Sequence, residues 1–319
     1  MPLVQSVMKC VFPAARGLRM VSLVCLTLLG TRVYAGLDAV VTIPPLKGLL
    51  EPLLPAGSTV RVLMPPGRSE HNYEFTPADL AATGNADLVL IVGLGLESRV
   101  EGFLSSHVRT TRVDVELAAA AGVEGQETCD GAHGDKSDDG DHAGHTHTVD
   151  PHVWLDPALV KIALPKLAEA VERALTNKGQ WNAEARAALA SALANELKRV
   201  TDVEAAYAEA LKPFAGQKIV THHAAFGRLA ERYGLVIAAV IRMNEGEEPT
   251  PGRIAAIVQA VRKEKVRAIF VEPQFDATTA ERVARAAGVR LLKIDPLGDG
   301  DWFAMMAANL GALKEGLSP

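Results

Sequence analysis

Histidine is the residue type with the most evident chemistry in this chain of 319 residues, and its nine copies are unevenly placed. Residues 127–148 are rich in acidic side chains, almost free of large apolar ones, and hold four histidines: His133, His142, His145 and His147. His152 follows in the compact apolar segment VDPHVWLDP. Imidazoles and carboxylates are common ligands of Zn²⁺. The two segments predict a metal that the polar stretch collects and that a more ordered site holds.

The polar stretch has two interpretations. Three of its histidines, His142, His145 and His147, are separated by two residues and then by one, which is close enough for weak, exchanging metal coordination. A stretch with so many acids and so few apolar residues is also typical of a solvated insertion without a specific role. The sequence leaves both open: a low-affinity zinc collector or sensor, and a plain polar insertion.

The rest of the chain supplies the elements that must position a metal site. Short β-branched runs alternate with helical patterns on both sides of the middle of the chain. The runs are residues 38–43, 60–64, 87–92, 112–115, 218–221, 236–241, 266–271 and 290–294, and the helical patterns include residues 45–54, 77–83, 226–233, 251–263 and 278–287. Strands separated by helices form parallel sheets. We therefore predict an α/β fold of two (β/α)4 lobes with parallel sheets.

A long helix is predicted between the two lobes. Residues 180–211 contain no glycine or proline, and apolar residues recur there at every third or fourth position. One helix of this length is about 48 Å long at 1.5 Å per residue, and it would join the lobes rigidly. The alternative is two helices broken near Thr201. We assign residues 36–178 to the first lobe, 179–211 to the linker helix and 212–319 to the second lobe.

Candidate ligands lie at the carboxyl ends of predicted strands, where parallel α/β sheets bind their ligands. His71 follows the second strand, His222 and His223 follow strand 218–221, and Asp295 directly follows strand 290–294. With His152 and one histidine of the adjacent pair, they supply three imidazoles and one carboxylate. This set suits Zn²⁺, and it suits Mn²⁺ if the carboxylate binds with both oxygens. Asp295 precedes a proline, so capping of a turn is its alternative role.

Several blocks of the sequence resemble the metal-specific solute-binding proteins of ABC importers, and within them the zinc-uptake branch (ZnuA type, cluster A-I). The blocks are PPGRSEHNYEFTP (65–77), ADLVLIVGLGLE (86–97), HVWLDP (152–157), HAAFGRLAERYGL (223–235), FVEPQF (270–275) and IDPLG (294–298). The resemblance runs in order from about residue 38 to the end. It implies two lobes joined by a long helix with one transition metal between them. It also implies delivery to a membrane permease driven by a cytoplasmic ATPase.

Carried over by motif, the resemblance implies the ligands His71, His152, His223 and Asp295. The position of the Ala-Phe-Gly motif selects His223 rather than its neighbour His222, which is expected to be a cleft residue. The polar stretch with its histidines also resembles the zinc branch. One departure is that zinc-branch members often carry a disulfide in the second lobe, whereas this chain has no cysteine after Cys129.

Other acidic residues have supporting roles in this prediction. Glu70 completes the site if Asp295 does not reach it. Glu272, at the end of strand 266–271, is expected to accept a hydrogen bond from a ligand histidine. Asp150 and Asp156 precede prolines and are expected to shape the backbone around His152.

The N-terminus predicts export from the cytoplasm. Three basic residues precede an apolar run, residues 20–29, and the small residues Val33 and Ala35 follow it, as in a cleaved secretory signal. The mature chain is then expected to start near Gly36 in the periplasm. A membrane anchor is the alternative, but the run is much shorter than the ~20 residues that span a bilayer. Lipid attachment at Cys25 is a further alternative.

The sequence thus predicts high-affinity capture of Zn²⁺ outside the cytoplasm, by a monomer that is not an enzyme. The alternatives are a manganese receptor or adhesin of the same fold and, more remotely, a zinc hydrolase with an open fourth position. No His-Glu-x-x-His motif or serine nucleophile elbow supports the hydrolase. The formal net charge of −5 and the absence of a Lys/Arg run argue against a nucleic-acid partner.

Overall fold

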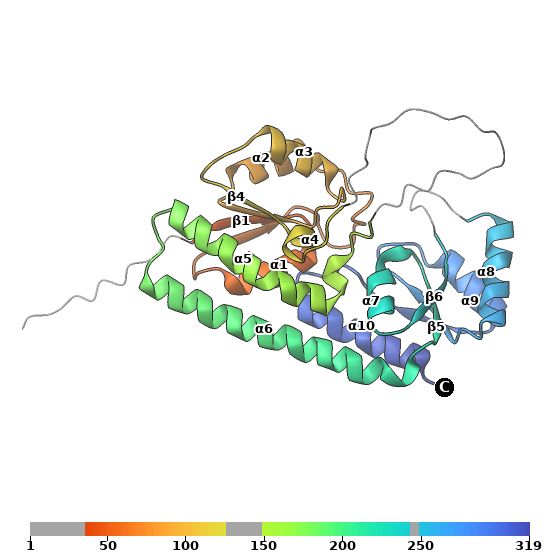
Figure 1. Ribbon diagram of the computed structural model, residues 1–319. Helices are drawn as coiled ribbons and strands as arrows, with labels where there is room; N and C mark the ends of the chain where they lie inside the picture. Colours follow the sequence, from red (N-terminus) through yellow and green to blue (C-terminus); the bar gives the residue numbers. More distant parts are fainter. Residues whose placement is uncertain (1–35, 126–148, 243–248) are drawn as a thin grey trace, which may run out of the picture. The chain divides into compact units, whose positions relative to one another are not determined.

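The computed structural model describes residues 36–125, 149–242 and 249–319, which belong to one compact unit (Figure 1). The predicted signal segment, residues 1–35, and the whole polar stretch, residues 127–148, lie outside the described residues. None of the helices within the described ranges has the length and apolarity to cross a membrane.

The first sheet has four parallel strands in the order β2-β1-β3-β4. The strands are β1 (Asp38–Val41), β2 (Thr59–Val62), β3 (Leu88–Ile91) and β4 (Val113–Glu116). The accompanying helices are α1 (Pro44–Leu50), the 3-10 turn η1 (Glu51–Leu53), α2 (Pro77–Asn85), α3 (Ser98–Ser106) and α4 (Leu117–Ala120). The strand β3, LVLI, is buried at every position, as expected for a strand covered on both faces.

The second sheet repeats this order as β6-β5-β7-β8, again parallel throughout. Its strands are β5 (Lys218–Thr221), β6 (Val236–Val240), β7 (Ala268–Val271) and β8 (Arg290–Lys293). The helical elements are η4 (Ala224–Phe226), α7 (Gly227–Arg232), α8 (Pro251–Lys263) and α9 (Thr278–Ala287). The predicted α/β fold of two four-stranded lobes is confirmed. Each sheet reverses its winding between its two central strands, and such switch points are where open α/β sheets bind ligands.

The predicted long helix is one helix, α6 (Ala183–Leu211), of 29 residues. It begins at Ala183 because the side chain of Asn182 accepts hydrogen bonds from the two main-chain N–H groups of Glu184 and Ala185. No break occurs near Thr201, whose hydroxyl donates to the carbonyl of Leu197 one turn earlier.

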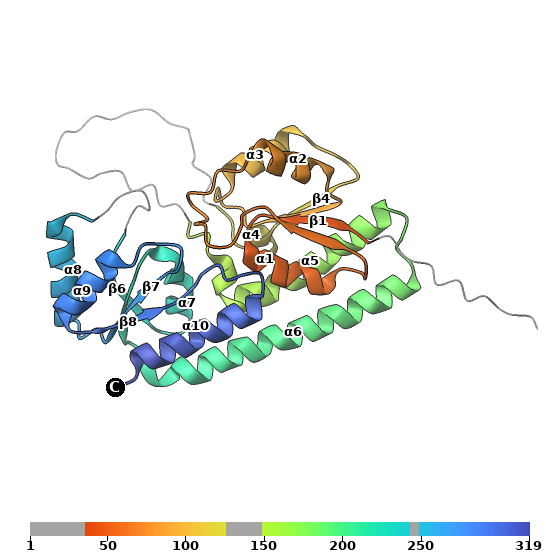
Figure 2. The same ribbon diagram turned by 180° about the vertical axis from the view of Figure 1, so that it is seen from behind.

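The helix α6 does not cross solvent alone. It lies beside α5 (Pro157–Asn177) and α10 (Trp302–Leu317), as both views show (Figures 1 and 2), and it continues into the 3-10 turn η3 (Lys212–Phe214). Its buried stripe includes Val200 and Tyr207, and the Tyr207 hydroxyl donates to the carbonyl of Met306 in α10 at 2.7 Å. The long helix therefore connects an early helix to the last one through packing as well as through the chain.

A pair of tyrosines tests this packing. Tyr207→Phe is expected to lower the free energy of unfolding of the metal-free protein by about 0.5–1.5 kcal/mol, because the buried hydrogen bond from its hydroxyl to the carbonyl of Met306 is lost. Its neighbour Tyr233, whose ring is tilted against that of Tyr207 at a centroid distance of 5.3 Å, is the matched control. Among the described residues its buried hydroxyl has no hydrogen-bond partner, so Tyr233→Phe is expected to be neutral or stabilising. Urea denaturation measures both, and equal effects would contradict the assigned role of the Tyr207 hydroxyl.

Candidate metal centre

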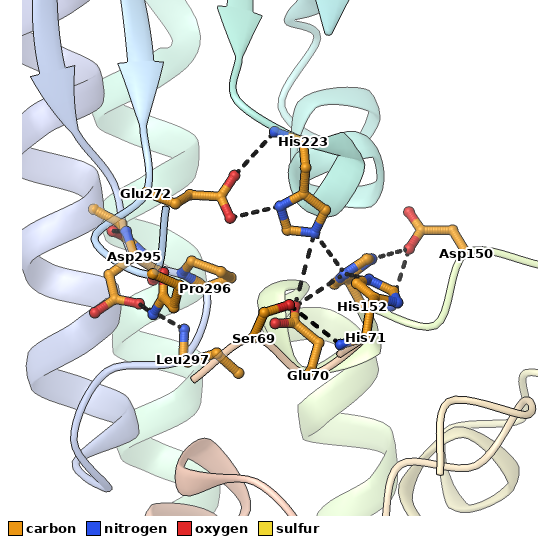
Figure 3. Close-up of polar contacts among 12 residues, drawn as sticks. Ser69, Glu70, His71, Asp150, His152, His223, Glu272, Asp295, Pro296 and Leu297 are labelled. Atoms are coloured by element: carbon orange, nitrogen blue, oxygen red, sulfur yellow. Dashed lines mark hydrogen bonds and ion pairs between the residues drawn. The ribbon is translucent and has the colours of Figure 1, made fainter. Parts of the chain in front are cut away.

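Four side chains converge in the structure: Glu70, His71, His152 and His223 (Figure 3). One ligand atom from each, a ring nitrogen or a carboxylate oxygen, lies within 4.8 Å of all the others. Three of the residues are buried, and His71 is exposed. Within the described part of the chain, this is the one group of histidine, cysteine and acidic residues with such an arrangement.

Three separate segments bring these side chains together. Glu70 and His71 lie in the loop between β2 and α2, and Tyr73 ties this loop down by donating to the carbonyl of Leu63 at 3.2 Å. His152 precedes the 3-10 turn η2 (Val153–Leu155), and His223 is the second residue after β5. The site therefore uses the carboxyl ends of strands in both sheets, together with one connecting segment.

Three of the distances between ligand atoms match the edges of a tetrahedral zinc site. The Nε2 atom of His152 lies 3.3 Å from His71 Nε2, 3.4 Å from His223 Nε2 and 3.4 Å from Glu70 Oε1. Glu70 Oε1 lies 3.8 Å from His223 Nε2. A tetrahedron with bonds of about 2.0–2.1 Å, as Zn²⁺ makes to nitrogen, has edges of about 3.3–3.4 Å. The donor set and its spacing therefore fit one zinc ion.

Two carboxylates orient two of the rings. Asp150 Oδ1 lies 2.7 Å from His152 Nδ1, and Glu272 Oε2 lies 2.5 Å from His223 Nδ1. A carboxylate accepts, so each Nδ1 carries a proton, and the Nε2 atom of each ring, which holds a lone pair whenever the ring is neutral, faces the cluster. Glu70 Oε1 faces the same point, is buried, and has no hydrogen-bond partner among the residues that the structure describes. A positive charge at this point, either a metal ion or protons on the rings, balances the carboxylate.

The surroundings of the two oriented rings favour their protonated, positively charged forms. Burial alone would lower the pKa of His152, but the adjacent carboxylates of Asp150 and Glu70 outweigh burial and raise it to about 9. Burial also opposes protonation of His223, yet Glu272 raises its pKa. In the metal-free protein a proton therefore occupies the region that a metal would take, and metal binding must displace it.

The other two side chains keep the forms that bind metal. Burial would raise the pKa of Glu70, but the imidazoles around it, His152 first, lower it to about 2. Loss of water around the ring of His71 lowers its pKa to about 4, against the opposing effect of Glu70. At neutral pH, Glu70 is therefore an anion and His71 a neutral donor.

The structure brings together three of the four residues predicted first, and Glu70 is the fourth member of the group. Asp295 lies apart from it (Figure 3): its Oδ1 accepts from Gln274 Nε2 at 2.7 Å and from the main-chain nitrogen of Leu297 at 2.9 Å. His222 is fully buried with its ring against Phe275, outside the group. The loop histidines His133, His142, His145 and His147 lie outside the described residues.

Asp150 has a contact that the sequence analysis did not predict. It was expected only to shape the backbone before a proline, yet its carboxylate meets both the ring and the main-chain nitrogen of His152. An aspartate two residues before a histidine is the available sequence signal, since that spacing lets the carboxylate turn back onto the following residues. The signal is weak because the same spacing is also ordinary turn chemistry.

Comparison with known proteins shows the family of the chain. The family model described as zinc-uptake complex component A, periplasmic (ZnuA) matches residues 39–316. The chain belongs to this family. Its members are metal-binding solute-binding proteins and not enzymes. A crystal structure of ZnuA superimposes with a TM-score of 0.69 at 24% identity, covering 88% of this chain and 99% of that one.

Curated relatives include binders of two different metals. AdcA, a zinc-binding lipoprotein of Streptococcus pneumoniae R6, is 27% identical over 292 residues, which cover 88% of this chain and 55% of AdcA. The chain thus spans about half the length of that relative. MntA, a manganese-binding lipoprotein of Halalkalibacterium halodurans, is 28% identical over 291 residues, which cover 89% of each chain. Family membership alone therefore does not select the metal.

Proposed function

We propose that this protein captures Zn²⁺ outside the cytoplasm with His71, His152, His223 and Glu70, and delivers the ion to an ABC permease with its cytoplasmic ATPase. The observation that carries the proposal is the convergence of four ligand atoms within 4.8 Å of one another, three of whose distances, 3.3–3.4 Å, match the edges of a tetrahedral zinc site. A site closed by four protein ligands holds its ion as cargo and leaves no position for a reactive water.

The donor set favours zinc over manganese. Three imidazoles and one carboxylate suit Zn²⁺, whereas Mn²⁺ prefers more oxygen ligands and a higher coordination number. The second candidate is nevertheless Mn²⁺, because MntA is as similar to this chain as AdcA is and Glu70 can offer two oxygens. The two candidates differ in whether manganese competes with zinc.

Location and partners follow from the family and the N-terminus. The family description names a periplasmic component of an uptake complex, which supports a membrane partner. The basic and apolar residues before Gly36 support export through a cleaved signal. The name of AdcA as a lipoprotein keeps attachment through Cys25 as the alternative mode of anchoring.

Titration of the metal-free protein from Gly36 onward with Zn²⁺, repeated in excess Mn²⁺, tests the function. One tight zinc site that manganese does not displace is expected. Additional weaker sites that vanish when residues 127–148 are deleted would assign the polar stretch a collecting role. Displacement of zinc by manganese would favour the second candidate, Mn²⁺, as the captured ion. Absence of any tight site would refute the proposed function.

A pair of isosteric variants identifies the fourth ligand. Glu70→Gln is expected to weaken zinc binding by about tenfold or more, because a neutral amide oxygen replaces a buried anion at the centre of the cluster. Asp295→Asn is expected to change the affinity only a few-fold, since Asp295 is engaged by Gln274 and Leu297. Competition with a zinc chelator measures both. The reverse order of effects would make Asp295 the ligand and require its loop to rearrange on binding.

A further inference from the structure

The segment that carries His152 precedes the long helix in sequence, and besides packing on α4 and α5 it is held by polar contacts from the second lobe. The guanidinium of Arg228 in α7 donates twice to the carbonyl of Asp150, from Nε at 2.9 Å and from Nη2 at 2.5 Å. Farther along, Arg232 of the same helix pairs with the buried carboxylate of Asp156 at 2.5 Å. One face of α7 therefore fixes both ends of the segment.

Tryptophan contacts fix the middle of the segment. Trp154 Nε1 donates to the carbonyl of Pro296, which follows β8, and Trp302 Nε1 at the start of α10 donates to the carbonyl of Trp154. Both indoles are fully buried. His152 thus shares its support with His223, while Glu70 and His71 lie on a loop of the first lobe.

Within this support, the carboxylate of Asp150 contacts the ring of the ligand. Its Oδ1 accepts from the main-chain nitrogen of His152 at 2.9 Å and lies 2.7 Å from the ring Nδ1. Its other oxygen lies close to Gly227, where a Cβ atom would come within 3.1 Å of Oδ2. A glycine at this position therefore lets the Asp150 carboxylate approach the segment that follows His223.

We propose that Asp150 is a positioning residue, which holds the ring of His152 with Nε2 toward the metal and couples that ring to the second lobe through Arg228. The inference rests on the proposed function and extends it. His152 and His223, oriented by Asp150 and Glu272, then form a prearranged pair of nitrogen donors, and Glu70 and His71 complete the site from the other lobe. Carboxylate partners of metal-bound histidines generally act by fixing the tautomer and orientation of the ring.

A purely structural role for Asp150 makes a different prediction. If Asp150 served only the turn before His152, its loss would lower the stability of the protein and leave both the zinc affinity and the ring proton of His152 unchanged. A positioning role requires both to change. The test therefore needs an affinity, a stability and a signal from the ring itself.

The experiment compares Asp150→Ala and Asp150→Asn with the control Glu169→Gln, which removes an exposed carboxylate on α5 that pairs with Lys166. Zinc affinity is measured by chelator competition, and unfolding by urea. In ¹⁵N-labelled metal-free protein, the Nδ1–H proton of His152 is followed by NMR, with that of His223 as an internal reference. The latter should persist in every variant because Glu272 is intact.

Asp150→Ala is expected to weaken zinc binding by about 10–100-fold, the usual cost of losing such a partner, and to abolish the slowly exchanging Nδ1–H signal of His152. Asp150→Asn should lose less zinc affinity, because its amide oxygen can still accept a hydrogen bond. The control variant should bind zinc as the parent protein does. Unchanged affinity with a retained signal would overturn the inference, as would a loss of stability alone. If the parent protein binds no zinc, the proposed function fails, and the Nδ1–H signal of the metal-free variants still decides the role of Asp150.

Discussion

Replacing His223 with alanine is expected to weaken zinc binding by more than about 100-fold. Loss of an outer partner of a metal-bound histidine alone costs about 10–100-fold, so loss of the ligand itself should cost more. His223 is one of three nitrogen donors in a group whose atoms lie within 4.8 Å of one another, and among the described residues no other histidine lies close enough to replace it. The effect should appear as a lost tight site in a chelator competition.

The neighbouring histidine is the matched control for this experiment. His222 follows the same strand and is also buried, but its ring packs against Phe275, outside the cluster. His222→Ala is expected to retain tight zinc binding within a few-fold, whatever its effect on stability. Circular dichroism and urea unfolding of the metal-free variants separate misfolding from ligand loss. Similar affinities for the two variants would contradict the assignment of His223.

Zinc affinity is expected to decrease steeply as pH is lowered, starting from a pH well above the usual pKa of histidine. Because the carboxylates of Asp150 and Glu70 raise the pKa of His152 to about 9, this ring is protonated in the metal-free protein at neutral pH. A proton on Nε2 competes directly with the metal, so binding tightens as pH rises toward 9 and weakens as pH falls. Each displaced proton is worth about tenfold in affinity per pH unit, or roughly 1000-fold between pH 8 and pH 5.

Calorimetry in buffers with different heats of ionisation counts the protons that zinc displaces. At least one proton per zinc is expected at pH 7, and the raised pKa of His223 adds to this number. The pKa of His71 is about 4, so zinc displaces a proton from this ring only in acid. An affinity that is flat above pH 6.5 would show that the carboxylates do not raise the pKa of either ring. Equal affinity at pH 5 and pH 7.5 would contradict imidazole ligation altogether.

Much of the architecture follows from local patterns along the chain. Parallel strands buried on both faces must be continuous apolar runs, and β3, LVLI, is such a run. Helix starts were predictable where proline begins a helix, as at α8 and α2, because the first turn leaves its N–H groups unpaired and the fixed φ of proline already suits a helix. The uninterrupted stretch before Leu211 predicted α6 because nothing in it disfavours a helix.

What the sequence determined by itself was the order of the elements and the three histidine positions, because strand ends and motif blocks are local features. Only the tertiary structure decided that Glu70, and not Asp295, faces the three rings, because the direction of a carboxylate depends on the packing of its whole loop. The same holds for Asp150. Its contact with His152 exists because α7, which lies more than seventy residues later in the chain, holds its backbone in place.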